Sequence, residues 1–352
     1  MKFLKLLVLA SSFGCMAQDS LAEKKVKVDF SGYIETFYAY DFEEPEQRNN
    51  YTFLYNHNRH NDFNVNMALL KAAINYENVY ANIAIHGGTY VTDNYASEDI
   101  KFLNEAYVGL FLDKKQQTSI EAGIMPSNIG FETANSHANL TVTRSILAEN
   151  SPYYLTGFKL NHQVNEKLSF AFLVTNGWQR IKKINGKIAP SIGTQLTYKT
   201  NSKSVFNWST FLGKETLGSD FTTRFFNNLY YDFAYNDRWR NILGFDLGLQ
   251  KSIDSNAWYS WCSPVFITQF KCNPKWNLAY RMEYYDDAKN ILIAINDVPF
   301  KTIGNSFNID FLPNSRAKVR AEAKWFHATE NIFDQGKSKE NFSITSTLSF
   351  EF

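Results

Sequence analysis

The chain has 352 residues, a formal net charge of +1 and nearly equal numbers of basic and acidic residues. This balance argues against nucleic acid as a partner, because nucleic-acid binding requires a clustered basic surface. Aromatic residues make up 16% of the chain, with 30 Phe and 20 Tyr. Such an excess is typical of outer-membrane β-barrels, which place aromatic girdles at both lipid–water interfaces.

The first seventeen residues have the pattern of a secretory signal peptide. A short basic start at Lys2 and Lys5 precedes the apolar stretch 6–10, and small residues follow up to Ala17. We expect cleavage after Ala17, which predicts export, a signal peptide at 1–17 and a short periplasmic segment at 18–25. Acylation of Cys15 in a lipoprotein is an alternative, although residues 12–14 fit a lipobox poorly. No later segment has the roughly 18 apolar residues that a membrane helix needs.

The predicted strands recur along the rest of the chain as amphipathic runs in which alternate residues share a face. They span residues 26–40, 63–76, 79–91, 100–112, 118–125, 154–164, 168–176, 188–198, 204–213, 224–235, 239–250, 257–271, 276–285, 301–311, 317–329 and 341–352. Seven short turns alternate with eight longer loops, among them 92–99, 126–153 and 214–223. This alternation predicts one closed antiparallel transmembrane β-barrel over 26–352, with about 16 strands, short periplasmic turns and longer extracellular loops. One missed hairpin would give 14 or 18 strands, and the competing interpretation is a soluble β-sandwich.

The closing strand predicts which face meets lipid. Phe342, Ile344, Leu348, Phe350 and Phe352 fall on one parity, while Ser, Thr and Glu residues occupy the other. A terminal amphipathic strand that ends in Phe resembles the recognition strand of bacterial outer-membrane barrels, and this resemblance implies an interaction with the barrel-assembly machinery. Residues 317–325 alternate in the same way. Their four consecutive charges on one face suit a water-filled lumen, because a dry core would exclude them.

Several short motifs resemble a known family. They are Gly123-Ile124-Met125-Pro126 with Gly130-Phe131-Glu132, Asn176-Gly177-Trp178, Gly213-Lys214-Glu215 and 281–287, which reads Arg-Met-Glu-Tyr-Tyr-Asp-Asp. Their order and the closing strand resemble the OmpL-like family of β-barrel porins, over essentially the whole mature chain. Lys214 departs from the Pro expected at that position. The resemblance implies an outer-membrane pore and says little about its solute.

The longest connection, 126–153, is the third external loop and by resemblance to general porins is expected to fold into the lumen and narrow it. We predict a mixed-charge lumen that passes small hydrophilic solutes or ions by passive diffusion, with weak ion selectivity. The candidate channel-lining residues are Glu35, Glu105, Glu132, Arg144, Glu149, Lys159, Arg281, Glu283, Lys318, Arg320, Glu322 and Lys324. Any of them could instead pair within the wall and set its register.

Other functions remain open from the sequence. The same wall would serve an adhesin or a scaffold that displays its loops to a surface machine. A hydrolase at the barrel rim is less favoured, because no Gly-x-Ser-x-Gly elbow occurs. His57 and His60 near Asp62 could bind a metal, but we expect a solvated loop there and neither metal nor cofactor. Cys262 and Cys272 lie ten residues apart on one strand, about 33 Å in extended chain, so they are expected to remain free thiols. Whether the barrel is a monomer or a trimer also stays open.

Overall fold

The computed structural model describes residues 25–45, 53–184, 188–217 and 220–352. The predicted signal peptide and Cys15 lie outside these residues. In the described part of the chain, no helix is long and apolar enough to cross a membrane.

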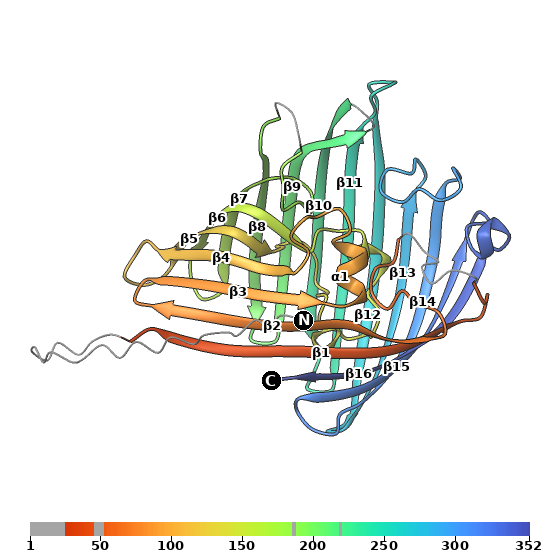
Figure 1. Cartoon of the computed structure of the whole chain (residues 1–352), viewed down its shortest axis with the longest axis horizontal. Helices are drawn as coiled ribbons and strands as arrows, with labels where there is room; N and C mark the ends of the chain where they lie inside the picture. The colour runs from red at the N-terminus through yellow and green to blue at the C-terminus, as the bar shows by residue number, and fades with distance from the viewer. Residues whose placement is uncertain (1–24, 46–52, 185–187, 218–219) are drawn as a thin grey trace, which may run out of the picture.

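Sixteen antiparallel strands form one closed barrel, which confirms the predicted fold class. They are β1 (Lys27–Asp41), β2 (Asp62–Tyr76), β3 (Val79–Gly87), β4 (Leu103–Phe111), β5 (Thr118–Pro126), β6 (Tyr154–Gln163), β7 (Leu168–Thr175), β8 (Ser191–Asn201), β9 (Ser204–Leu217), β10 (Asp220–Ala234), β11 (Trp239–Lys251), β12 (Trp258–Asn273), β13 (Trp276–Asp287), β14 (Phe300–Phe311), β15 (Ala317–Ala328) and β16 (Glu340–Glu351). Each strand pairs with its neighbours in sequence, and the strands at the front of the barrel cross those at the back, as the tilt of barrel strands requires (Figure 1).

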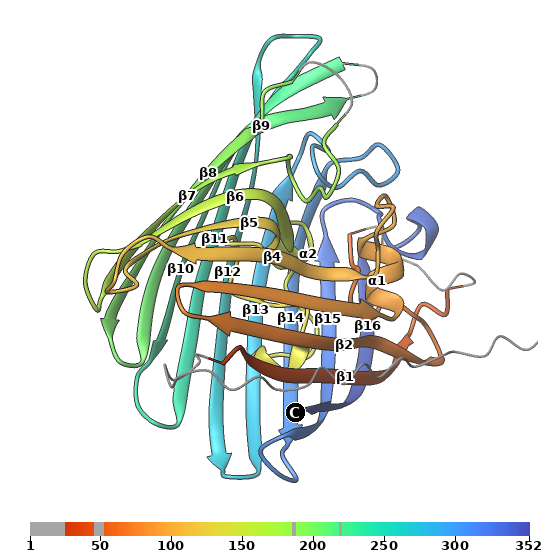
Figure 2. The ribbon, with the colours of Figure 1, turned by 60° about the vertical axis from the view of Figure 1, so that its left-hand side comes forward.

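The barrel closes where its first and last strands meet. β1 and β16 pair from Tyr33 opposite Glu351 to Asp41 opposite Ser343. Beyond this ladder, Gly32 and Phe352 exchange two backbone hydrogen bonds of 3.0 Å each. Closure leaves no edge strand with unpaired backbone groups, which a membrane would penalise strongly. The chain therefore forms a continuous cylinder (Figure 2).

The two faces of the strands differ as the parity predicts. On β16, Leu348 and Phe350 are 55% and 44% exposed, whereas Thr347 and Ser349 are buried inside the barrel. The same alternation holds on β11, where Leu243 and Phe245 point outward. The assignment of the closing strand's apolar residues to the outer surface is thus confirmed.

The connections define two ends of the barrel. We call the end with the seven connections β2–β3, β4–β5 and so on to β14–β15 the short-turn end, and the opposite end the long-loop end. One predicted loop is wrong: residues 214–217 and 220–223 continue β9 and β10 and pair with each other. Charged and polar residues had suggested a loop there, but their alternation also suits a hairpin that extends past the rest of the wall. Cys262 and Cys272 are free, as expected.

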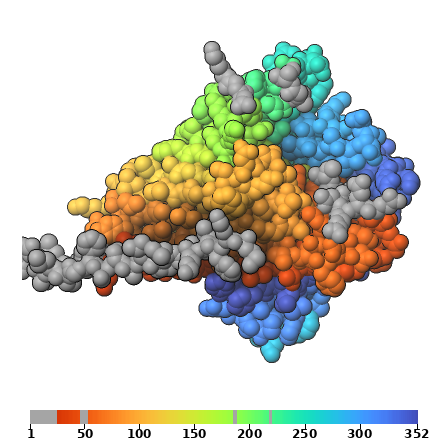
Figure 3. All heavy atoms as spheres, in the orientation of Figure 1, coloured from red at the N-terminus to blue at the C-terminus, as the bar shows by residue number. Residues whose placement is uncertain are grey.

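Part of the lumen is a dry hydrophobic core, which the expectation of a wholly polar interior did not include. At the long-loop end, inward-facing aromatic residues of the wall pack against apolar residues of the loops. Members of this cluster include Phe53, Leu54, Ile129, Ile146, Phe211, Phe226, Trp261, Tyr285, Ile293, Phe300, Phe326, Ile332 and Phe333. Loops thus fold into the mouth. In the space-filling view, orange atoms from the first third of the chain meet blue atoms from its last part on the right-hand side of the molecule (Figure 3).

Candidate functional site: the lumen and its third loop

The connection between β5 and β6, residues 127–153, lies inside the barrel, and we call it the third loop. It contains a 3-10 turn, η1 (Ser136–Ala138), and a one-turn helix, α2 (Ile146–Glu149). Ser145 caps α2, because its Oγ accepts a hydrogen bond from the Ala148 N–H at 3.2 Å. Figure 2 shows α2 within the ring of strands.

Arg320 on β15 anchors the first half of the third loop. Its guanidinium donates to the carbonyl oxygens of Ser136 at 2.6 Å and of Asn139 and Leu140 at 3.2 Å each. Asp310 on β14 accepts from Nε of the same arginine at 2.7 Å. One fully buried side chain thus satisfies several loop carbonyls that have no partner in a helix or sheet.

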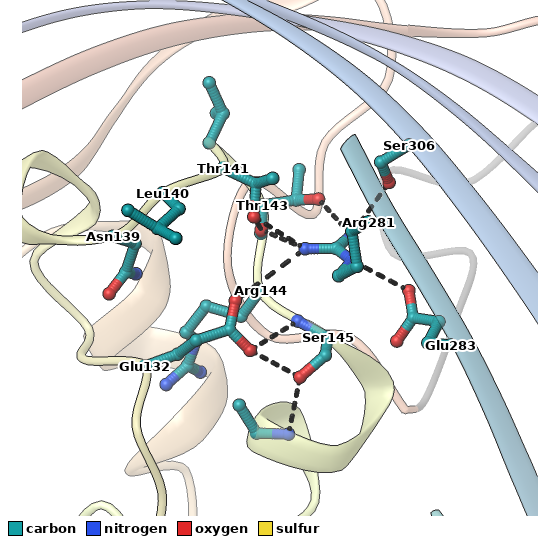
Figure 4. Close-up of polar contacts among 12 residues, drawn as sticks. Glu132, Asn139, Leu140, Thr141, Thr143, Arg144, Ser145, Arg281, Glu283 and Ser306 are labelled. Atoms are coloured by element: carbon teal, nitrogen blue, oxygen red, sulfur yellow. Dashed lines mark hydrogen bonds and ion pairs between the residues drawn. The ribbon is translucent and has the colours of Figure 1, made fainter. Parts of the chain in front are cut away.

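Arg281 on β13 anchors the second half (Figure 4). It donates to Oγ1 of Thr141 at 2.9 Å, to Oγ1 of Thr143 at 3.0 Å and to Ser306 on the wall at 2.9 Å. Three carboxylates lie within ion-pair distance of it: Glu283 at 3.1 Å, Glu322 at 3.2 Å and Glu132 at 3.8 Å. The arrangement joins three wall strands, β13, β14 and β15, to the loop through one cation.

Wall carboxylates also receive loop N–H groups. Glu322 accepts from the Thr143 N–H at 2.7 Å and from its hydroxyl at 2.6 Å. Glu283 accepts from the Ile146 N–H, at the start of α2, at 2.6 Å. A carboxylate at a helix N-terminus satisfies donors that the helix leaves free. The carboxylates of Glu322 and Glu283 therefore bind the third loop and do not face open water.

The charged residues of the third loop pair within the barrel. Arg144 forms an ion pair with Glu149 at 3.1 Å and lies 3.5 Å above the ring of Tyr153. Glu149 in turn accepts from the Tyr55 N–H at 2.8 Å, which joins the third loop to the first loop, 42–61. Burial raises the pKa of the Glu132 carboxyl above its ordinary value, and the charge of Arg281 partly offsets this rise.

The first loop also turns inward, so the interpretation of His57 as part of a solvated loop is wrong. Nε2 of His57 lies 3.0 Å from Oε2 of Glu35 on β1, and both side chains are buried. The Ser136 hydroxyl donates to the same carboxylate. Because Asn66 on β2 donates to it as well, at 2.9 Å, Glu35 joins the wall, the first loop and the third loop.

The other predicted lining residues also lie on inward faces. Lys71 pairs with Glu105 at 2.8 Å, and Lys159 lies 3.6 Å from Glu121. Lys318 donates to the His137 carbonyl oxygen. Lys324 lies 5.0 Å from the ring centroid of Phe326. All twelve predicted residues are therefore inside the barrel, and most of them hold the loop or pair with the wall.

An open cavity of about 800 Å³ remains between the third loop and the wall strands β1, β2 and β4. Tyr33, Lys71 and Glu105 line it on the wall side, and Phe131 and Thr133 on the loop side. The cavity reaches the short-turn end at Arg316, Glu351 and Phe352. The second loop, residues 88–102 between β3 and β4, contains the helix α1 (Thr89–Asn94) and borders the cavity with Tyr90 and Tyr95. A small solute could move in this space.

Some inward polar residues were not among the predicted set. Asp310 and Asn308 on β14 hold the loop, since Asn308 accepts from the Val142 N–H at 3.0 Å. Asp246 on β11 accepts from Asn228 at 2.6 Å, and Asn228 also accepts from the Gly130 N–H. Strand parity could have identified these residues. Among the described residues, no group of three or more His, Cys, Asp or Glu side chains is placed to hold a metal ion.

A closed cylinder of sixteen antiparallel strands with a loop folded into its lumen defines an outer-membrane porin fold. Solved structures with this fold include the channel DcaP of Acinetobacter baumannii (TM-score 0.63, 13% identity, 93% of this chain and 97% of that one). They also include an anion-selective porin from Comamonas acidovorans (TM-score 0.61, 10% identity, 93% of this chain and 100% of that one). A third is Salmonella typhi OmpF in complex with daunomycin (TM-score 0.61, 11% identity, 92% of this chain and 97% of that one).

The chain belongs to the family described as "Putative beta-barrel porin-2, OmpL-like", which matches residues 27–352. The resemblance seen in the sequence is thus confirmed, and the protein is one of the bacterial outer membrane. A comparison with curated proteins finds no match.

Proposed function

We propose that the protein is a diffusion channel for small hydrophilic solutes, with a mixed-charge lumen that the third loop narrows. The observation that carries this proposal is the third loop itself, which the buried Arg281 and Arg320 hold against β13–β15. Because the loop lies to one side, a cavity of about 800 Å³ stays open beside it, lined by polar residues such as Lys71 and Glu105 as well as by aromatic ones. A barrel of sixteen strands is wide enough for such a passage.

The orientation and assembly follow from the same proposal. The long-loop end faces the outside and the short-turn end the periplasm, as in porins with short periplasmic turns. Residues 1–17 direct export and are removed. The strand β16, ending in Phe352, is the segment that the barrel-assembly machinery would recognise. Solutes and outer-membrane lipid are the partners expected of the mature barrel, either alone or as an oligomer.

A scaffold or adhesin is the second candidate. It is favoured by the hydrophobic cluster at the long-loop end, in which residues such as Phe53, Ile293 and Phe333 pack between loops and wall. Packing of this kind fixes the loops as a rigid display surface and restricts the external mouth. The two functions differ in whether solutes cross the barrel.

Catalysis is not part of the proposal. Ser349 Oγ lies 3.1 Å from Nδ1 of His137, and Nε2 of His137 lies 3.5 Å from Glu351. These three residues have the composition of a hydrolytic triad. However, Ser349 is 1% exposed beneath the third loop, so an ester substrate has no path to its hydroxyl. If the purified barrel cleaved lipid or peptide and Ser349→Ala abolished the cleavage, the enzyme interpretation would replace this one.

A planar-bilayer recording tests the channel. The purified barrel, shown to be folded by its heat-modifiable migration on a gel, should produce discrete conductance steps in neutral lipid. A folded barrel that never conducts would contradict the channel and favour the scaffold.

A further inference from the structure

We propose that the short-turn mouth of the barrel contains an anion-binding vestibule that favours small soluble solutes with two or more negative charges, such as polycarboxylates and phosphate esters. As a statement about solute class, this inference rests on the proposed channel function. The vestibule itself can also be tested by binding, without any transport.

The vestibule is a cavity of about 440 Å³ formed by β8–β12 and two of the turns that join them. Strand register places its residues on the inner face. Lys199 on β8 is opposite Val205 on β9, which is opposite Asp232 on β10. On the next strand pair, Ala234 is opposite Arg240 on β11. Side chains from four adjacent strands therefore enter the same part of the lumen.

Positive charge predominates in this cavity. Its lining includes five basic side chains and two acidic ones, a formal excess of three positive charges. The basic residues are Lys199, Lys203, Arg238, Arg240 and Lys271, and the acidic ones are Asp232 and Asp237. The vestibule is thus strongly basic, although the chain as a whole is almost neutral.

Both acidic residues are already paired. Asp237 forms an ion pair with Lys203, and Asp232 accepts from Nε and Nη2 of Arg240 at 2.9 Å and 2.5 Å. Within the described ranges, no carboxylate lies within ion-pair distance of Lys199, Arg238 or Lys271. Three cationic groups are therefore available to a solute, in contrast to the deeper Arg281 and Arg320, which the third loop occupies.

These basic residues lie at the short-turn mouth of the barrel, where they can attract anions from solution. A mouth lined by charges of one sign within low-dielectric walls concentrates ions of the opposite sign. Its field extends over about 8 to 10 Å at ordinary salt concentrations. The open cavity beside the third loop lies within this reach, because Tyr230, which lines it, and Asp232, which lines the vestibule, are successive inward positions on β10. An anion held at the mouth is thus next to the passage.

The experiment compares two variants that each lose three positive charges. The vestibule variant is Lys199→Gln, Arg238→Gln, Lys271→Gln, and the control is Lys114→Gln, Lys115→Gln, Lys275→Gln. The control residues lie in turns at the same end but do not line this cavity. Reversal potentials in a KCl gradient across neutral lipid give the permeability ratio of chloride to potassium. Calorimetric titration of the folded barrels in zwitterionic detergent with pyrophosphate, citrate and acetate gives binding.

The native barrel and the control should prefer chloride and bind pyrophosphate and citrate more tightly than acetate. In the vestibule variant the permeability ratio should fall roughly threefold or more, and both polyanions should lose affinity roughly tenfold. If the triple variant does not fold, Arg238→Glu alone, at an exposed turn position, takes its place. This single variant should also lower the permeability ratio and the affinity for both polyanions.

Two outcomes separate this inference from the channel. If the barrel does not conduct but binds polyanions in a manner that depends on the three residues, the vestibule stands and the channel does not. If the barrel conducts with the same permeability ratio in all variants and binds no polyanion, the vestibule is refuted and the channel stands.

Discussion

Nη1 of Arg320 lies 2.6 Å from the carbonyl oxygen of Ser136, a contact between a barrel strand and a loop residue 184 positions earlier in the chain. The relationship shows how the lumen is organised. Buried wall arginines use their several N–H donors to hold a loop whose carbonyls have no regular partners. The width of the passage therefore depends on side chains of β13 and β15 as much as on the loop.

Removing this anchor should destabilise the barrel interior. Arg320→Met leaves Asp310 buried without its ion-pair partner, and breaking such a pair costs about 3 to 5 kcal/mol. Arg320→Lys keeps a charge for Asp310 but has fewer donors for the loop carbonyls, so we expect a smaller loss. Urea unfolding in detergent micelles, followed by tryptophan fluorescence, measures both. Native stability in Arg320→Met would show that the arginine does not hold the loop.

The cavity beside the third loop should be the route of the solute. Ala138 is an exposed residue of η1 and lines this cavity. In a Cys262→Ser, Cys272→Ser background, Ala138→Cys should react with a cationic thiosulfonate reagent, and conductance should then fall in steps. Lys114→Cys, in an exposed turn, is the matched control and should leave conductance unchanged. Full conductance after complete labelling of Ala138→Cys would place the passage elsewhere.

Gly123 on β5 should tolerate no side chain. Its φ is +134°, and an added Cβ would lie 2.1 Å from the carbonyl oxygen of Ala106 on the neighbouring strand. Because that atom belongs to the backbone ladder, Gly123→Ala should cost about 1 to 3 kcal/mol in the free energy of unfolding. Gly87→Ala is the control, since nothing lies within 4 Å of an added Cβ there. Equal urea midpoints for the two variants would contradict this expectation.

Acid should loosen the third loop through His137. Burial, with the nearby charge of Lys318, lowers the pKa of this histidine from 6.5 to about 4, while Glu351 and Glu35 act to raise it and Arg320 to lower it further. A released histidine therefore binds a proton below about pH 6.5 that the docked one does not, so docking is fully favoured above that pH and weakens towards pH 4.

Conductance should accordingly rise between pH 7 and pH 4.5, and His137→Asn should reduce this rise. The comparison between the two proteins matters because Glu132, with its raised pKa, acts in the opposite direction and favours docking as it becomes protonated. If the native barrel and His137→Asn respond identically to pH, His137 is not the titrating group.

Strand parity predicted the wall and its two faces, because every residue of a barrel strand faces either the lumen or the lipid. It did not predict that inward residues such as Trp261 and Phe326 are apolar partners of folded loops. The packing partner of an inward aromatic residue is known only when the conformation of the loop that covers it is known. Loop conformation depends on contacts between residues that are far apart in the sequence. The buried pairing of His57 with Glu35 was missed for the same reason.

Local polarity misled the prediction at residues 214–223, where β9 and β10 continue as a paired hairpin. Inward charges were easier to find than their roles. Arg281 and Glu322 were expected to face water in the lumen, whereas they bind Thr143 of the third loop. Parity gives the face that a residue occupies, but the partner on that face comes from a segment with no periodicity.

Deletion of residues 128–148 tests the central claim most directly, since these residues form most of the third loop. Single-channel conductance of the native and deleted barrels should be compared in neutral lipid, after heat-modifiable migration has shown that both are folded. We expect the deleted barrel to conduct clearly more than the native one. Equal conductance in two folded barrels would contradict the proposal that the third loop narrows the passage.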